Sequence, residues 1–269
     1  MALKIENFKI AGKPNHLQKK LDGEIPVDRL ELLYLVNSWG RANVVYLNFK
    51  NNISIKIDKC SANECYELNK LDVSQITNME DLFASSLFNG SISSWDVSKV
   101  TDMNSMFYSA ENFNQSLNSW NTSNVTNMSC MFYLAEKFNG DIGKWDVSNV
   151  TDMGRMFSFS KKFNQDISKW DVSNVENMNF MFAETKVFNQ NISSWNLDKV
   201  DSCKYMLLNT EAFINKYNNG EILPNNSNEL KKWFNENREN MNAIDLKEKH
   251  GDEIDNFFNI ISNTKKIIF

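Results

Sequence analysis

Large apolar residues recur along this chain at a constant spacing of 25 positions. Tryptophan and phenylalanine each hold one register of the pattern, at Trp95, Trp120, Trp145, Trp170 and Trp195, and at Phe88, Phe113, Phe138, Phe163, Phe188 and Phe213. The residues that follow each tryptophan are also repeated, as in the sequences WDVSNVTDMGRMF from position 145 and WDVSNVENMNFMF from position 170. A fixed period of this length predicts an array of stacked units, here over residues 71–213.

The apolar spacing inside one unit predicts a short strand, a turn and then a helix. Ile142, Trp145 and Val147 follow the spacing of a strand whose alternate side chains turn inward. From Val150 to Phe163 the apolar positions fall three and four apart, which places them on one face of a helix. A unit this small cannot bury enough surface by itself, so about six such coils are expected to stack into a solenoid.

The segments on either side of the array are expected to cover its two ends. Residues 1–70 contain a helix candidate over 25–39 and an alternating hairpin pattern over 43–49 and 53–58. Residues 214–269 contain one helix that begins at Asn226 or Ser227, and a second over about 252–262. The second helix carries an apolar stripe, for which docking on the array is favoured over binding a partner. The predicted units are an N-terminal cap of helix plus hairpin (1–70), the repeat solenoid (71–213) and a helical C-terminal cap (214–269).

Most of the repeated large residues are interpreted as core. The tryptophans lie in the inward register of each strand, and the methionine pairs, such as Met153 and Met156, share the buried face with the phenylalanines. The predicted structural core comprises Trp95, Trp120, Trp145, Trp170 and Trp195 together with Phe113, Phe138, Phe163 and Phe188.

Positions that change from unit to unit are the candidates for binding a partner. They lie between the two methionines and at the first and second positions after the Met-Phe pair, and the residues selected are Tyr108, Tyr133, Arg155, Phe159, Phe180 and Tyr205. A fixed core with variable surface positions is typical of repeat proteins that present a specific patch. Unselected drift at solvated positions explains the variation equally well.

The position after each tryptophan is predicted to form an outward column of carboxylates and amides, made of Asp72, Asp96, Asn121, Asp146, Asp171 and Asn196. Adjacent carboxylates repel, so pairing with nearby lysines such as Lys144 and Lys169 is the favoured interpretation. A bound Ca²⁺ is the alternative, although it needs more converging oxygens at each site.

No metal or cofactor site is predicted elsewhere. Cys60, Cys65, Cys130 and Cys203, with His16 and His250, lack the spacing of a zinc site, so free thiols are favoured. A Cys60–Cys65 disulfide stays open for an exported protein. The chain has neither a nucleophile motif nor a phosphate-binding glycine loop, and we therefore do not expect an enzyme.

Net charge narrows the range of partners. With a formal charge of −5, the chain is not expected to bind nucleic acid, which requires clustered lysine and arginine.

The chain contains no apolar run long enough for a transmembrane segment and no secretory signal. The sequence as given indicates a cytoplasmic protein, whereas removal of an export signal would indicate a secreted or cell-surface one. Oligomeric state is left open.

The motif WDVSNVTDM-x-x-MF followed by FNQDIS resembles the 25- to 26-residue surface-protein repeat of mollicutes and other low-GC bacteria, a family of unknown function related to BspA-like leucine-rich repeats. This resemblance covers residues 71–213. It implies an α/β fold, a right-handed leucine-rich-repeat-like solenoid of about six 25-residue strand-turn-helix coils with N- and C-terminal caps. It also implies a bacterial surface location and a role in adhesion.

Together these observations predict a non-enzymatic protein-interaction module, of surface or adhesion type, that binds a protein or glycan through the solenoid surface. An intracellular binding protein, such as an inhibitor or immunity-type partner that uses the variable positions and the flanks, is the alternative hypothesis.

Overall fold

The computed structural model describes residues 44–48, 54–58 and 65–265 of the 269-residue chain. The helix expected over 25–39, together with His16 and Cys60, lies outside these residues. So do the side chains of the apolar stripe expected over 252–262.

The hairpin predicted in the N-terminal segment is confirmed. Strand β1 (Val44–Asn48) pairs in antiparallel register with β2 (Ser54–Asp58), with Tyr46 opposite Lys56 at the centre. A short 3₁₀ helix, η2 (Cys65–Lys70), precedes the first repeat.

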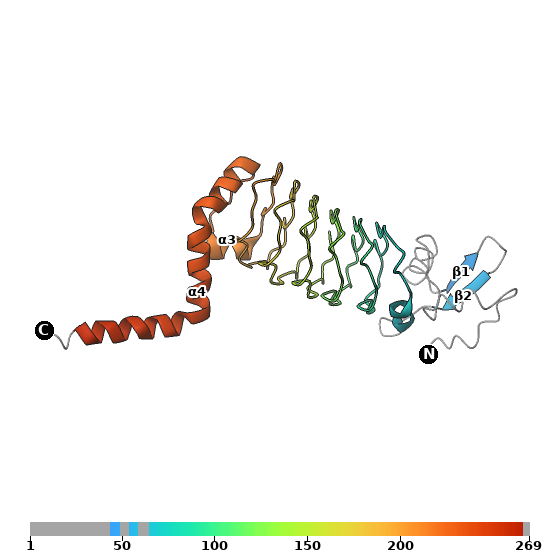
Figure 1. Cartoon of the computed structure of the whole chain (residues 1–269), viewed down its shortest axis with the longest axis horizontal. Helices are drawn as coiled ribbons and strands as arrows, with labels where there is room; N and C mark the ends of the chain where they lie inside the picture. The colour runs from blue at the N-terminus through green and yellow to red at the C-terminus, as the bar shows by residue number, and fades with distance from the viewer. Residues whose placement is uncertain (1–43, 49–53, 59–64, 266–269) are drawn as a thin grey trace.

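Successive repeats lie side by side, each as one open coil (Figure 1). Neighbouring coils are joined by backbone hydrogen bonds between residues about 24 positions apart. In the fourth repeat, the N–H of Met153 donates to the carbonyl of Asn177 at 2.9 Å, and the N–H of Phe157 donates to that of Met181 at 2.9 Å. Single parallel bridges mark the same edge of each coil, linking Asn78, Asp102, Asn127, Asp152, Asn177 and Ser202 in order. Each coil therefore supplies backbone partners for the next.

The strand and the helix expected inside each coil are not formed. Residues 71–210 contain neither element apart from the isolated bridges, and the coil path is a series of turns. Turn bonds such as Trp145 N–H to Ile142 carbonyl, 3.2 Å, bend the segment that was expected to be a strand. In the expected helix, alternate N–H groups donate to the neighbouring coil instead of to the carbonyl four residues earlier. In a helix those N–H groups would bond within their own coil and could not donate to the next one. The spacing of buried residues at i, i+3 and i+4 therefore results from turns.

Aromatic ladders fill the interior of the stack. The five repeat tryptophans are 2–3% exposed, and the repeat phenylalanines from Phe107 onward are fully buried. Each tryptophan also donates its indole N–H to a carbonyl of the preceding coil; Trp145, for example, donates to Leu117 at 2.9 Å. Tryptophan thus supplies apolar volume together with a buried hydrogen bond, which phenylalanine cannot do.

A second ladder of asparagines holds the return loops in register. The side-chain oxygen of Asn114 accepts the backbone N–H of Asn139 at 2.8 Å, and Asn139 accepts that of Asn164 at 2.8 Å. Asn89 and Asn164 do the same for Asn114 and Asn189. The asparagine of the repeated FN dipeptide therefore acts as a link between coils.

Two helices close the C-terminal end of the stack. The short helix α3 (Glu211–Tyr217) places Phe213 on the phenylalanine ladder, 6.2 Å from Phe188. Helix α4 (Ser227–Lys265) follows, and the side chain of Asn226 caps it by accepting the N–H of Glu229 at 2.9 Å. α4 first crosses the end of the stack and then bends away from it (Figure 1). The bend occurs at His250, whose backbone is non-helical and which precedes a glycine.

Side chains of α4 form hydrogen bonds with backbone groups at the edge of the last coil. In the middle of the stack, the next coil provides the partners for such groups. Arg238 donates to the carbonyls of Ser193 and Trp195, the latter at 2.9 Å. Lys231 donates to the carbonyl of Val200 at 3.0 Å, and the N–H of Cys203 donates to the hydroxyl of Ser227 at 2.9 Å. An exposed edge of unpaired groups is a site of unwanted association, and α4 covers it.

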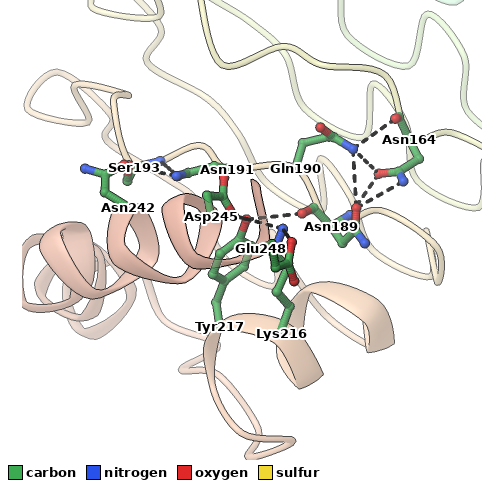
Figure 2. Close-up of polar contacts among 10 residues, drawn as sticks. All are labelled: Asn164, Asn189, Gln190, Asn191, Ser193, Lys216, Tyr217, Asn242, Asp245 and Glu248. Atoms are coloured by element: carbon green, nitrogen blue, oxygen red, sulfur yellow. Dashed lines mark hydrogen bonds and ion pairs between the residues drawn. The ribbon is translucent and has the colours of Figure 1, made fainter. Parts of the chain in front are cut away.

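A polar cluster ties α3 to α4 and both to the last coil (Figure 2). The ammonium of Lys216 forms ion pairs with Asp245 and Glu248, at 2.8 and 2.9 Å. Burial acts to lower the pKa of Lys216, but hydrogen bonds to these two carboxylates raise it above its ordinary value. Burial, together with the hydrogen bond to Asp245, raises the pKa of the Tyr217 phenol. The ion pairs and the hydrogen bond from Tyr217 thus join α3 to α4.

Candidate functional site

The variable positions of the repeat lie on one edge of the stack, which we call the turn edge. In each coil it runs between two residues of left-handed backbone conformation, over 105–109, 130–134, 155–159, 180–184 and 205–209. The φ angles at these ends lie between 53° and 61°. This geometry lets alternate N–H groups reach the next coil, while the intervening N–H groups donate to the carbonyl three residues earlier in four-residue turns.

Three predicted binding residues form a continuous row on the turn edge. The ring of Tyr108 lies 5.2 Å from that of Tyr133, and Tyr133 contacts Phe159 edge to face at 6.0 Å. Phe159 is 36% exposed, and the two tyrosines are half-buried. The row joins three consecutive coils into one partly exposed aromatic surface.

The other three predicted binding residues form a second row in the following coils. The guanidinium of Arg155 lies over the ring of Phe180, 5.2 Å from its centre. Phe180 stacks on Tyr205 at 5.0 Å, and Tyr205 is 39% exposed. The first row ends and the second begins in the fourth repeat, where the exposed residues Arg155 and Phe159 are four positions apart. The structure thus groups the six candidates into two rows of three residues each.

Large side chains on the turn edge occupy a costly backbone conformation. A left-handed φ is uncommon outside glycine and asparagine, and a bulky residue there costs on the order of 1 kcal/mol. Arg155, Phe159, Phe180 and Tyr205 all have this conformation, whereas Ser105 and Asn209 occupy equivalent positions with small polar side chains. Bulky residues at such positions point to a role other than stability.

The column after the tryptophans has a structural role. Each side chain accepts the backbone N–H two residues later, as Asp146 does from Ser148 at 3.0 Å. Hydrogen bonds from the hydroxyl and the N–H of the following serine hold the pKa of Asp96 and of Asp171 below their ordinary values. Among the described residues, no direct ion pair joins a neighbouring lysine to this column, although the charge of Lys99 also helps to lower the pKa of Asp96. Lys99 donates to Gln75 at 2.9 Å and Lys199 to Asn174 at 2.6 Å.

A shallow polar depression lies where the first three full coils turn toward their tryptophans. Its volume is about 650 Å³, and it is lined by Ser91, Ser93, Ser94, Gln115, Ser116, Asn118, Ser119, Asp141 and Lys144. Sequence reasoning missed this feature, although the serine-rich text before Trp95 and Trp120 was a visible signal. Much of the lining is already hydrogen-bonded within the stack, as when Asn118 donates to Asp141 at 2.6 Å.

Clusters of metal-binding side chains were sought among residues 68–251, whose side chains the structure describes. Groups of three or more histidine, cysteine or acidic side chains able to share an ion do not occur there. Cys130 and Cys203 are free thiols, and burial raises the pKa of each. Within the described part of the chain, no helix combines the length and the apolar character needed to cross a membrane.

Comparison with known proteins gives one match. The family model described as "Mycoplasma protein of unknown function, DUF285" matches residues 51–161 and again residues 137–247. The two ranges overlap over 137–161, which is one repeat length, so they follow the same periodic array. No curated protein and no solved structure matches the chain. Because the two matches together cover more than half of its length, the chain belongs to this Mycoplasma family of unknown function, DUF285.

Proposed function

We propose that this protein is a non-enzymatic interaction module, of surface or adhesion type, that binds a protein partner through its turn edge. The observation that carries the proposal is the pair of aromatic rows on that edge. Tyrosine, phenylalanine and arginine are enriched at protein interfaces, where a few such side chains supply most of the binding energy. Here these side chains are at least partly exposed, and four of the six, Arg155, Phe159, Phe180 and Tyr205, occupy backbone positions that disfavour them.

Rigid presentation supports the same proposal. The rows rest on coils joined by backbone hydrogen bonds and by the asparagine ladder. Side chains held in place before binding lose less conformational freedom when a partner docks. A net charge of −5 further favours a protein or glycan partner over nucleic acid.

We infer a right-handed leucine-rich-repeat-like solenoid, related to the BspA-like repeats, with caps at 1–70 and 214–269. The constant 25-residue period and the bonding between adjacent coils support it. Membership of a Mycoplasma family fits a bacterial surface protein.

The test is a binding assay with a turn-edge variant. Tyr108→Ser, Tyr133→Ser and Phe159→Asn together remove the first row. A matched control replaces three exposed apolar residues elsewhere with serine, Leu87, Val187 and Ile222, which are 59%, 39% and 82% exposed. Fluorescently labelled proteins are applied to intact epithelial cells and to immobilised extracellular-matrix proteins.

We expect saturable binding by the wild type and the control, and at least a tenfold loss by the turn-edge variant at unchanged Tm. Protease treatment of the cells should remove the binding, because the proposed partner is a protein. Equal binding by the wild type and the turn-edge variant would contradict the assignment to this edge. Absence of saturable binding to every cell and matrix surface would contradict the adhesion role.

A further inference from the structure

Arg155 has a guanidinium group that the protein itself does not use. Its contact is with the face of Phe180, at 5.2 Å, and the residue is exposed. In the described part of the chain, no carboxylate pairs with it and no oxygen accepts a hydrogen bond from its side chain. The planar group therefore presents its full set of N–H donors to solvent.

Several other charged side chains of the described residues are already paired within the protein. Arg238, the second arginine of the described residues, donates hydrogen bonds to backbone carbonyls of the last coil. Lys161 pairs with Glu136 at 2.7 Å, and on the turn edge itself Glu184 accepts from Asn209 at 2.6 Å. Among the described residues, Arg155 combines an aromatic support with the absence of a carboxylate ion pair.

An arginine held flat on an aromatic ring is well suited to bind a carboxylate. Its rigid donor fork matches the two oxygens of a carboxylate, and stacking fixes the guanidinium before the ligand arrives. Such charge-assisted, bidentate pairs are among the stronger polar contacts in proteins. The cation also lies in an otherwise acidic protein, so it marks one point where a negative group is favoured.

The surroundings of Arg155 indicate what the carboxylate is attached to. Phe180, which carries the guanidinium, stacks on Tyr205 of the next coil, and Phe159, which contacts Tyr133, lies four residues after Arg155 in the same coil. Phe180 is stacked between Arg155 and Tyr205, so neither face of this ring is open to a sugar, which binds aromatic residues by stacking on a free face. Apolar side chains of a peptide can pack on the exposed ring edges instead.

We propose that Arg155 binds the carboxylate of an aspartate or glutamate in a protein segment whose neighbouring apolar residues pack on the two aromatic rows. This inference rests on the proposed function, because it names the chemistry that the same edge recognises. The ligand class is an acidic-apolar peptide segment.

The experiment selects peptides without knowledge of the partner. Random twelve-residue peptides displayed on phage are panned against the full chain, and the enriched peptides are synthesised for affinity measurement. Affinities are compared for the wild type, Arg155→Gln, Arg155→Lys and the turn-edge variant. Lys162→Gln is the control, because it removes one positive charge from an exposed position of the same coil outside the turn edge.

We expect enriched peptides to carry aspartate or glutamate beside aromatic or aliphatic residues. Arg155→Gln should weaken their binding at least tenfold, and Arg155→Lys should weaken it too, because an ammonium lacks the planar fork. Lys162→Gln should change affinity less than twofold. Changing the peptide acid to its amide should abolish the difference between wild type and Arg155→Gln.

Other results would overturn the inference in distinguishable ways. If the turn-edge variant loses binding while Arg155→Gln binds like the wild type, the carboxylate site is wrong and the proposed function stands. If both variants bind like the wild type, both proposals fail. If a glycan array shows Arg155-dependent binding to sialylated glycans, and no acidic peptide is enriched, the ligand is a sugar acid and the peptide assignment fails.

Discussion

Replacing Trp145 by alanine probes the tryptophan ladder at the middle of the array. Its indole is 3% exposed and lies 6.3 Å from the rings of Trp120 and Trp170 on either side. Removing a buried tryptophan costs about 3–5 kcal/mol, because both the transfer energy and a residual cavity contribute. The effect should extend beyond one coil, since each coil depends on contacts with its neighbours.

Phenylalanine at the same position separates volume from hydrogen bonding. Trp145→Phe keeps an aromatic ring but loses the N–H that donates to the carbonyl of Leu117. That carbonyl still accepts the backbone N–H of Trp120 at 3.0 Å, so it is not left without a partner. We expect a loss of about 1–2 kcal/mol, well below that of alanine.

Urea unfolding followed by far-ultraviolet circular dichroism measures both losses, since the chain's seven tryptophans would complicate a fluorescence signal. Tyr205→Ala serves as the control, because its side chain is 39% exposed. It should cost at most about 1 kcal/mol. A loss below about 1 kcal/mol for Trp145→Ala would show that the ladder contributes little and that the packing argument is wrong.

Three further predictions concern strain, pH and the C-terminal end. Ser105→Gly should raise stability by about 0.5–1 kcal/mol, because glycine accepts the φ of 53° without penalty, whereas Ser105→Ala should not; thermal unfolding compares them. The pKa of Asp171 is lower in the folded than in the unfolded chain, so the ionised carboxylate stabilises the fold. This stabilisation is complete at pH values above the pKa of the unfolded chain and is lost as the pH falls through the pKa of the folded chain. Asp171→Asn keeps an acceptor for the N–H of Ser173 and should therefore reduce the fall in Tm between about pH 5 and pH 2, an outcome that an unchanged pH profile would contradict. Arg238→Ala should lower stability by about 2 kcal/mol and increase self-association in light scattering, because it removes two donors from the exposed edge; a monodisperse variant of wild-type Tm would refute this.

The sequence was sufficient to predict which residues are buried. Tryptophan and phenylalanine at constant spacing have to face the same direction in every coil, and Trp145 and Phe163 are accordingly buried. The hairpin β1–β2 and the start of α4 also follow from local signals, namely alternation and the capping asparagine Asn226. These features depend on neighbouring residues or on simple periodicity, which a sequence displays directly.

The path of the backbone inside each coil could not be predicted in this way. Met153, Met156 and Phe157 have helical spacing, but the spacing of buried residues does not reveal where their N–H groups point. Here those groups alternate between a turn within the coil and the next coil, which requires left-handed residues at Arg155 and Phe159. Neither arginine nor phenylalanine favours the left-handed conformation, so it could not be predicted from local residue preferences.

The candidate site was visible only as variation between repeats. The selected residues did fall on one edge, because equivalent positions of stacked coils lie in columns. Their grouping into two rows, and the stacking of Arg155 on Phe180, depend on the directions in which the side chains point. The repeat period alone does not predict these directions.

The asparagine ladder has a consequence for how such a protein can change in length. Each asparagine links to the one 25 residues later, and every coil offers its neighbours the same set of bonds. Insertion or deletion of one whole repeat therefore leaves every ladder continuous and both ends unchanged. An insertion or deletion of another length has to be absorbed within one coil if the asparagines on its two sides are to stay linked. Duplication of the repeat thus lengthens the turn edge and multiplies its variable positions without requiring a new core.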